Sequence, residues 1–310
     1  MSFSSDVKNE IIQKEYTRYN AAISEIAAMI CFGGRLKKTD GEYTFSIVSE
    51  NPKICRRAYS LMKGALSVSS KIKIKKISDR ITNYEVVVEN EKDIDRLFKA
   101  TYLIDDDKTI SNFVSFHIDN RLVSSRERKA AFVAGAFVTS GSVMDPKKNY
   151  HLEFATSRYS LAKEFGELLG TLGIPAKNVT RKSKYVLYYK SSDAITDVLT
   201  VLGAVNCLME YHNAKIVKEM RNKINRTINC ETANLSKTVD ASFEQAACIQ
   251  KLIDKGIFDT LPENLKSIGI LRLEYRESSL KELGEMLNPP IGKSGVNHRL
   301  RKLMDIANGI

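Results

Sequence analysis

A nine-residue segment near the start of the chain recurs in its middle, and this repeat constrains the fold more than any other feature. Residues 26–34, Ile-Ala-Ala-Met-Ile-Cys-Phe-Gly-Gly, align with residues 133–141, Val-Ala-Gly-Ala-Phe-Val-Thr-Ser-Gly, at an offset of 107 residues (141 − 34). The alignment continues without a gap through Tyr43 and Tyr150. A long-period repeat predicts two similar halves that face each other. Because small side chains let helix backbones approach closely, we expect the halves to meet along these two segments.

The pattern of apolar and polar residues predicts the same order of elements in both halves. In the first half we expect a helix over 20–32, a strand over 43–48, a helix over 52–66, a hairpin of 71–75 with 84–89, and a closing helix over 91–101. In the second half we expect a helix over 126–139, a strand over 150–155, a helix over 157–172, a hairpin of 178–181 with 185–190, and a helix over 192–202. The sequence therefore predicts an α+β domain with a pseudo-twofold axis.

The length of 310 residues suits more than one domain, and a content of 43% hydrophobic and 27% charged residues is ordinary for a globular protein. No apolar run approaches the length of a membrane span, and the first residues do not resemble a signal peptide. We therefore expect a cytoplasmic protein without membrane contact. The net charge of +11 suggests a polyanionic partner, although its meaning depends on where the cations lie.

Two basic stretches without acids, over 53–76 and 168–192, occupy matching places in the two halves. In the strand expected over 71–75, lysine alternates with isoleucine, so the strand has one basic face. The candidates for contacts with DNA phosphates in these stretches are Lys71, Lys73, Lys75, Arg181, Lys182 and Lys184. The alternative is that these cations only keep exposed strands soluble.

Five cysteines are scattered through the chain without a Cys-x-x-Cys spacing, and the four histidines are equally dispersed. This distribution favours buried free thiols over a zinc site or disulfides. The sequence also contains no recognisable nucleophilic triad and no glycine-rich phosphate loop. We therefore expect neither a cofactor nor a bound metal.

A long basic helix is expected over 206–228, followed by a polar stretch over 229–238. Low apolar content there indicates a connector between domains, which either contacts DNA phosphates or remains solvated. The expected divisions of the chain are two repeat halves over 1–108 and 109–205, the basic helix with its linker over 206–240, and a carboxy-terminal module over 241–310.

The carboxy-terminal module is expected to contain four short helices, over 242–255, 262–274, 279–287 and 294–307. Ser279 and Glu282 form a capping box, and two consecutive prolines end that helix. Ser294 is a candidate cap for the last helix. Two helices joined by a short turn are typical of a helix-turn-helix, although this turn is a few residues longer than the tightest form.

The last helix has one apolar and one polar side at a period of 3.6 residues. The apolar side consists of Val296, Leu300, Leu303 and Ala307. No acid interrupts the sequence over 288–304. The candidates for reading base edges are Asn297, His298 and Arg301, and those for DNA phosphate are Lys293, Ser294 and Lys302. The alternative is an ordinary amphipathic surface helix.

The repeated segment resembles the LAGLIDADG motif of homing endonucleases, in which paired helices end in acids that hold divalent metal over DNA. This resemblance implies two saddle-shaped antiparallel sheets astride the duplex, with the basic strand faces toward its phosphates. The positions of the metal-binding acids fall on Gly33 and Ser140, and neither side chain supplies a carboxylate. Asp40 and Asp145 lie downstream in polar turns, where solvation is favoured over metal binding. We expect the nuclease fold without the nuclease chemistry.

A LAGLIDADG-like domain without metal ligands, followed by a helix-turn-helix, resembles the WhiA family of bacterial regulators of sporulation and cell division. The resemblance covers nearly the whole chain and includes residues 135–141, 229–239, 279–284 and 293–302. It implies a non-enzymatic DNA-binding protein in which the carboxy-terminal module supplies most promoter recognition. The repeat domain is then a scaffold or an interaction surface.

Three functions remain open at the level of sequence. The leading interpretation is a sequence-specific DNA-binding regulator of transcription, associated with the nucleoid and linked to cell division, chromosome segregation or sporulation. A protein-interaction scaffold of cell division would instead recruit RNA polymerase or other regulators, with non-specific DNA binding in support. An active homing endonuclease would need the two missing acids. Because the repeat domain contains its own pseudo-twofold partner, we expect a monomer that binds double-stranded DNA.

Overall fold

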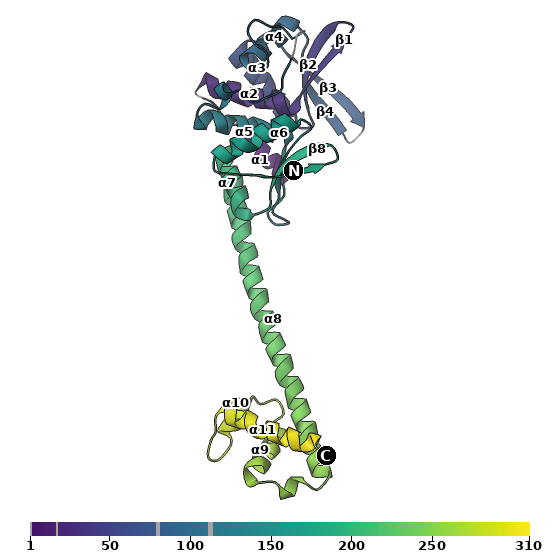
Figure 1. Cartoon of the computed structure of the whole chain (residues 1–310), viewed down its shortest axis with the longest axis vertical. Coiled ribbons are helices and arrows are strands. Elements are labelled where there is room, and N and C mark those ends of the chain that lie inside the picture. The colour runs from purple at the N-terminus through teal and green to yellow at the C-terminus, as the bar shows by residue number, and fades with distance from the viewer. Residues whose placement is uncertain (1, 17, 79–80, 111–113) are drawn as a thin grey trace. The chain divides into compact units, whose positions relative to one another are not determined.

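The computed structural model describes residues 2–16, 18–78, 81–110 and 114–310. The chain divides into two compact units, Met1–Lys218 and Glu219–Ile310. Helix α8 (Val205–Asp254) begins in the first unit and ends in the second. Figure 1 labels the elements of both units.

The first unit contains two halves built from a similar series of elements. The first half contains α1 (Phe3–Ile11), α2 (Tyr19–Gly33), β1 (Gly34–Thr39), β2 (Glu42–Ser49), α3 (Pro52–Leu66), β3 (Lys71–Ser78), β4 (Ile81–Val88) and α4 (Glu91–Ala100). The second half contains η1 (Asn120–Val123), α5 (Arg126–Ser140), β5 (Gly141–Val143), β6 (Leu152–Thr156), α6 (Tyr159–Thr171), β7 (Lys177–Arg181), β8 (Lys184–Tyr189) and α7 (Ser192–Leu202). The helices and strands predicted for the two halves are present, with ends shifted by a few residues. The sequence patterns do not predict α1, β1 or β5; half of the residues of β1 are charged, and β5 has only three residues.

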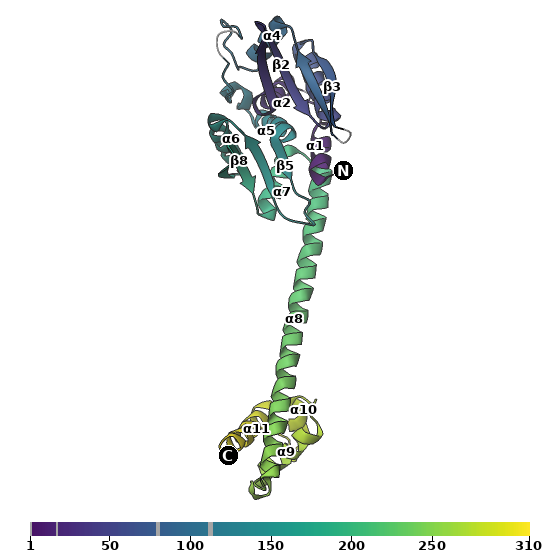
Figure 2. The same ribbon diagram turned by 90° about the vertical axis from the view of Figure 1, so that its right-hand side faces the viewer.

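Each half contains one four-stranded antiparallel sheet, in the order β1-β2-β4-β3 in the first half and β5-β6-β8-β7 in the second. Figure 2 labels β2 and β3 of the first sheet and β5 and β8 of the second. The strand registers preserve the sequence repeat. Gly34 pairs with Ile47 in the first sheet, and Gly141 pairs with Phe154 in the second, each 107 residues further along. The predicted α+β domain with two antiparallel sheets is therefore confirmed.

Aromatic side chains hold each sheet to the helices of its own half. In the first half, the ring of Phe45 in β2 meets Phe98 of α4 edge-on, with centroids 5.3 Å apart. In the second half, Phe154 of β6 contacts Phe165 of α6 at 5.1 Å and Phe137 of α5 at 5.7 Å. Edge-to-face contacts at these distances are favourable beyond the area that they bury.

Helices α2 and α5 lie side by side and join the two halves (Figure 1). They approach closely at Gly135, where an added Cβ would stand 2.3 Å from the backbone oxygen of Glu25 and 3.0 Å from the Cβ of Ala28. Ala28 and Gly135 are equivalent positions of the repeat, so this contact lies at the pseudo-twofold axis. A glycine is required here because any side chain would push the helix backbones apart.

A buried ion pair ties α3 to this helix pair. The side chain of Glu25 in α2 is fully buried, and its two carboxylate oxygens accept hydrogen bonds from Arg57 of α3 at 3.0 Å and 2.7 Å. Bidentate geometry is the strongest form of such a pair and offsets part of the desolvation of both charges. The first sheet, which packs on α3, is thereby fixed relative to α2.

Replacing Gly135 by alanine is expected to destabilise the first unit by about 1–3 kcal/mol, because the added methyl group overlaps the backbone of α2. The matched control is Gly170→Ala in α6, where an added Cβ meets no atom within 4 Å. Since alanine is the better helix former, that change should be neutral or slightly stabilising. Chemical unfolding of the full chain measures both effects, and similar effects of the two changes would contradict the close helix contact.

The second unit is built from helices. It consists of the last part of α8, a short turn of 3-10 helix (Phe258–Thr260), α9 (Glu263–Glu274), α10 (Leu280–Glu285) and α11 (Lys293–Asn308). Its core includes Ile249, Leu252, Ile268, Leu283, Leu300 and Leu303. The predicted all-α module is confirmed, and α10 and α11 are the two helices of its helix-turn-helix.

The polar stretch over 229–238 is helical, which corrects the expectation of a linker between two separate helices. Helix α8 continues through it for a total of 50 residues. The stretch contains no glycine or proline that would interrupt a helix. The hydroxyl of Thr238 donates to the carbonyl oxygen of Asn234 one turn earlier, at 2.9 Å, so this polar side chain is satisfied within the helix. Low apolar content there reflects solvent exposure and not a break in the backbone.

Candidate nucleic-acid interface

Helix α11 exposes the residues that the sequence assigns to DNA. Its buried side, as predicted, consists of Val296, Leu300, Leu303 and Ala307. Its other side exposes Lys293, Ser294, His298, Arg301 and Lys302, with Asn297 half-buried. Within the described residues, none of these six side chains makes a hydrogen bond or an ion pair. Their donors and acceptors are therefore available to a ligand.

The two helix caps predicted for the module have different outcomes. The capping box is confirmed, because the Ser279 amide donates to the Glu282 carboxylate at 2.7 Å and the Glu282 amide donates to the Ser279 hydroxyl at 3.3 Å. The prediction that Ser294 caps α11 is wrong. The helix begins one residue earlier, at Lys293, and its N-cap is Gly292, which has no side chain to accept a hydrogen bond.

The turn between α10 and α11 passes directly over a glycine of α10. The amide of Ile291 donates to the carbonyl oxygen of Gly284 at 3.0 Å. An added Cβ at Gly284 would stand 2.2 Å from the carbonyl oxygen of Ile291 and 3.2 Å from the side chain of Val296 in α11. Glycine is needed for this approach, and the approach fixes the start of α11 against α10.

Arg272 of α9 is a buried cation that the sequence analysis missed. Its side chain is almost fully buried, and it donates to the carbonyl oxygens of Arg276 and Ser278 at 3.3 Å and 2.9 Å. Burial lowers the pKa of this guanidinium. It also donates to the hydroxyl of Ser242 in α8 at 3.4 Å, so it connects α8 to the segment that leads into α10. Arg272 follows the buried Leu265 and Ile268 by seven and four residues, so it lies on the same side of α9. This helical spacing could have predicted that Arg272 is buried.

Helices α2 and α5 end without the acids of the LAGLIDADG pattern. An added Cβ at Gly33 would stand 3.0 Å from the side chain of Thr139 in α5. The hydroxyl of Ser140 turns back to donate to the carbonyl oxygen of Ala136 at 2.9 Å. Within the part of the chain that the structure describes, no group of three or more His, Cys, Asp or Glu side chains could hold a metal ion.

The two downstream acids lie in turns. Asp40 is exposed in the β1–β2 turn, where its backbone has a positive φ of 52°. Asp145 is half-buried, and its carboxylate accepts a hydrogen bond from the amide of Lys147 at 2.9 Å. Among the residues that the structure describes, neither belongs to a cluster of potential metal ligands. Of the five cysteines, Cys31, Cys55 and Cys207 are buried as expected, whereas Cys248 is half-buried and Cys230 is exposed on α8.

Helix α1 covers the end of α5. The hydroxyl of Ser4 accepts a hydrogen bond from the Val143 amide of β5 at 3.3 Å, and the Lys8 amine lies 5.9 Å from the centre of the Phe137 ring. Burial lowers the pKa of Lys8 to about 8. The Glu10 carboxylate accepts hydrogen bonds from two amides in the first turn of α8, at 2.7 Å and 2.9 Å. One helix thus covers the end of α5 and fixes the start of α8.

Because the native state holds the Lys8 proton less tightly than the unfolded chain does, stability should rise as the pH increases above about 8. Lys8→Met removes the desolvated charge, so it should raise the unfolding temperature at neutral pH, with a smaller gain at a pH of about 9.5. Thermal unfolding at the two pH values measures this difference. Lys177→Met, at an exposed lysine, is the control. A gain for Lys8→Met that does not change with pH would count against a desolvated amine.

The basic face of β3 is partly neutralised by an acid. The amines of Lys71 and Lys73 lie 3.1 Å and 2.5 Å from the carboxylate oxygens of Glu89, just beyond β4, in exposed ion pairs. The strand register could have revealed this, because Lys71 pairs with Val87 and Glu89 follows two residues later on the same face. Lys75 is also exposed. The three lysines lie on one face as predicted, but they are not three free cations.

Two further cations lie on the same face of the first sheet and were missed because β1 was not predicted. Arg35 pairs with Ser46, which pairs with Val87, which pairs with Lys71. Residues directly opposite on neighbouring strands project to the same side, so Arg35 and Lys71 mark the two edges of one face. Lys37 follows Arg35 by two residues and is exposed on that face as well.

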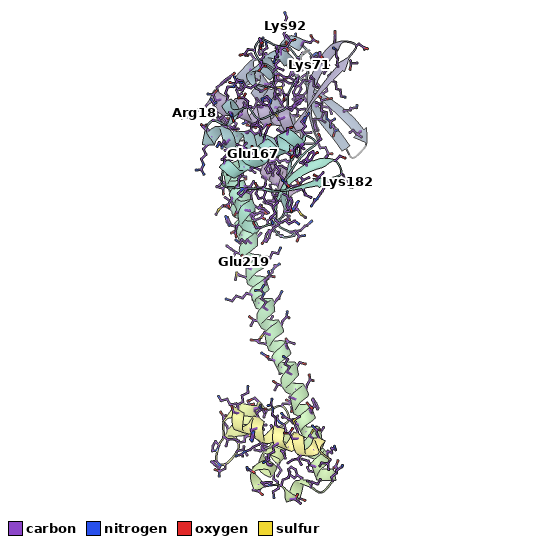
Figure 3. The ribbon with its side chains drawn as sticks, in the orientation of Figure 1. Arg18, Lys71, Lys92, Glu167, Lys182 and Glu219 are labelled. Atoms are coloured by element: carbon purple, nitrogen blue, oxygen red, sulfur yellow. The ribbon has the colours of Figure 1, made fainter. Side chains whose placement is uncertain are left out.

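In the second sheet, the predicted cations surround a hairpin tip. Lys182 and Ser183 form the turn between β7 and β8, and Figure 3 shows Lys182 at its end. Both have positive φ, 43° and 62°, a conformation that favours glycine and asparagine and is unfavourable for lysine. Arg181 and Lys184 face each other beside the tip. The backbone conformation does not favour a lysine at position 182. We therefore interpret the lysine there as being present for its positive charge.

Three family models match successive parts of the chain. The model of the WhiA N-terminal LAGLIDADG-like domain matches residues 19–104, that of the WhiA LAGLIDADG-like domain matches 129–221, and that of the WhiA C-terminal HTH domain matches 224–307.

Among the described residues, no helix combines the length and the apolar composition that a membrane span requires.

Similar proteins match over the full length. The chain is 42% identical over 310 residues to a protein of Clostridium perfringens (strain 13 / Type A) named "Probable cell division protein WhiA". It is 40% identical over 311 residues to a protein of the same name from Clostridium novyi (strain NT). Each alignment covers 99% of this chain and 98% of the relative.

Solved structures share the fold. The crystal structure of full-length DUF199/WhiA from Thermatoga maritima aligns with a TM-score of 0.60 and 23% identity, covering 100% of this chain and 99% of that one. The N-terminal LAGLIDADG domain of DUF199/WhiA aligns with a TM-score of 0.51 and 20% identity, covering 66% of this chain and 90% of that domain.

Proposed function

Because the chain belongs to the WhiA family, we propose that it is a sequence-specific DNA-binding protein that regulates transcription in cell division, chromosome segregation or sporulation. The observation that carries this proposal is the exposed side of α11, where six groups suited to bases and phosphates are free of protein partners among the described residues. In helix-turn-helix proteins the second helix of the motif enters the major groove. Double-stranded DNA is then the partner, and the nucleoid in the cytoplasm is the place of action.

The groups on α11 have the chemistry that the two kinds of contact need. The guanidinium of Arg301 is suited to donate two parallel hydrogen bonds to guanine, and the carboxamide of Asn297 is suited to pair with adenine. Lys293 and Ser294 lie in the first helical turn, where phosphate contacts are common. Arg299 has a different role, because its guanidinium donates to the Asn264 carbonyl of α9 at 3.4 Å and so holds α11 in place.

We expect Arg301→Ala to relax sequence preference by about 1–3 kcal/mol at one base step, because it removes a bidentate base contact. Fragmented genomic DNA retained by the full chain first identifies the preferred sequence, and binding to that sequence and to random DNA is then measured. The control is Lys281→Ala, which removes one charge from α10, where that lysine lies 3.8 Å from Glu285. If Arg301→Ala weakened binding equally on specific and random DNA, it would have no base-reading role.

The basic residues of the two sheets support a second, non-specific contact with phosphates. Lys75, Arg35 and Lys37 are exposed on the first sheet, and the cations around Lys182 are at the hairpin tip of the second. Exposed cations lower the free energy of binding to any DNA sequence by releasing counterions. Because Glu89 pairs with Lys71 and Lys73, and Arg181 lies 3.9 Å from Glu153, we assign these three cations a smaller share of this contact than Lys182 and Lys184.

Lys182→Asn tests the hairpin contact without straining the fold. Asparagine tolerates the positive φ of this position, so the hairpin should be as stable as in the original chain or more so. Loss of one phosphate contact should weaken binding to specific and random DNA alike and should reduce the slope of log affinity against log salt by about 1. Salt titrations of both DNAs measure this. An unchanged slope would remove Lys182 from the interface.

The same proposal excludes nuclease activity. Hydrolysis of a phosphodiester by divalent metal needs carboxylates that hold the ion, and Gly33 and Ser140 occupy those places. Cleavage of plasmid DNA by the purified chain in magnesium or manganese would contradict this part of the proposal.

A protein-interaction scaffold is the second candidate, and the name of the Clostridium relatives favours it. In that case the repeat domain recruits a partner such as RNA polymerase or another regulator, and DNA binding assists. Deletion of residues 279–310 separates the candidates. Function in the cell should be lost if α11 reads DNA, and it should be retained if the repeat domain acts by recruitment.

A further inference from the structure

The middle of α8 is a long, fully exposed stretch of helix. Every residue over 219–240 is exposed, and side chains project around the ribbon near Glu219 (Figure 3). Polar residues alone would explain such exposure, but large apolar side chains are also present. They are Met220, Ile224, Ile228, Leu235 and Val239, with exposed fractions between 42% and 66%. Contiguous exposed apolar surface of this kind usually marks an interaction site.

These five apolar side chains form one stripe. At 3.6 residues per turn, they fall within about 100° of one another around the helix. Val217, two residues before the second unit in the same helix, is 47% exposed and extends the stripe. Val217, Ile228 and Val239 are eleven residues apart, a spacing that drifts by only about 20° per repeat and keeps a stripe facing one partner helix.

Part of the stripe is symmetric in sequence about Ile228, whereas Met220 mirrors Ser236 and Leu235 mirrors Arg221. Valine stands eleven residues before and eleven residues after Ile228, and β-branched residues, Ile224 and Thr232, stand four residues away on either side. In an antiparallel pair of identical helices centred on Ile228, each Val217 would face a Val239, and each Ile224 would face the smaller Thr232. A twofold interface requires this kind of self-complementary surface.

The charges on the helix also favour antiparallel pairing with a second copy. Residues 212–226 carry a net charge of +4, from five basic residues and one acid, with histidine counted as neutral; one of the five, Lys215, is ion-paired with Asp193 of α7 at 2.5 Å, which leaves about +3 for a partner. Residues 230–244, their mirror image about Ile228, carry −2, from three acids and one lysine. Antiparallel pairing places opposite charges together, whereas parallel pairing would place each half beside a like-charged copy. The helix dipoles are also opposed in the antiparallel arrangement.

We propose that α8 is a self-association surface that pairs with α8 of a second copy of this chain, antiparallel and centred on Ile228. The contact spans about 22 residues, about 33 Å of helix, which belongs with small and reversible interfaces. The dimer is therefore expected at micromolar concentration, with monomer below it. The repeat domain, which is complete within one chain, is not part of this contact.

Ile228→Lys tests the surface, because two lysines would meet at the centre of the pair. Ile216→Lys is the matched control: it changes the same residue type in the same helix, with an exposed fraction of 54% against 52% for Ile228. Ile216 lies about 120° around the helix from Ile228 and outside the arc of the stripe. We expect sedimentation of the full chain from about 1 to 100 μM to show a dimer whose dissociation constant rises at least about 100-fold in Ile228→Lys and little in Ile216→Lys. A monomer throughout this range, or equal effects of the two changes, would overturn the proposal.

Disulfide cross-linking tests the orientation. In a chain with Cys230→Ser, Val217→Cys and Val239→Cys are made separately, tagged differently, and oxidised alone and as a mixture. Antiparallel pairing brings residue 217 of one copy to residue 239 of the other, so only the mixture should cross-link efficiently. Efficient cross-linking of Val217→Cys to itself would show parallel pairing and would overturn the antiparallel arrangement.

Discussion

The close contact between α2 and α5 at Gly135 is the constraint on which the first unit depends. Each half has one sheet, and α2 and α5 contribute largely to the core between them; α2 alone buries ten of its residues. Such nearly all-round burial is possible only when a second helix approaches closely. At Gly135 the backbones come so near that a methyl group would overlap the carbonyl oxygen of Glu25. Glu25 also binds Arg57 in a buried ion pair. One turn of α2 therefore fixes both the second half, through Gly135, and α3.

The ends of these helices show how a nuclease-like fold exists without the metal-binding acids of the motif. In place of carboxylates there is a glycine packed near Thr139 and a serine whose hydroxyl is turned back to its own helix. Helix α1 covers the adjacent end of α5 and places the Lys8 amine against an aromatic ring. Its Glu10 also caps the first turn of α8, so a segment without an equivalent in the repeat connects the end of α5 to the helix that leads into the second unit.

The second unit holds α11 by contacts that leave its outer side free. Gly284 lets the turn pass close to α10, Arg272 joins α8 to the segment before α10, and Arg299 bonds to α9. None of these contacts uses the six candidate DNA-binding groups. Pairing through α8 would give an assembly two such helices, and linked binding modules gain affinity through effective concentration.

The sequence alone determined the repeat, the order of the main elements, the helical module and the buried side of α11, because hydrophobic periodicity and turn residues are local signals. It also showed that carboxylates are missing at Gly33 and Ser140. Local signals did not predict β1, which is half charged and forms a strand because β2 supplies its hydrogen bonds. They also did not show that 229–238 is helical, since polar composition reports exposure and not backbone conformation. Only the tertiary structure decided that Glu89 neutralises Lys71 and Lys73, that Arg272 is buried, and that α1 covers the end of α5, because these contacts join residues whose proximity depends on how whole elements pack.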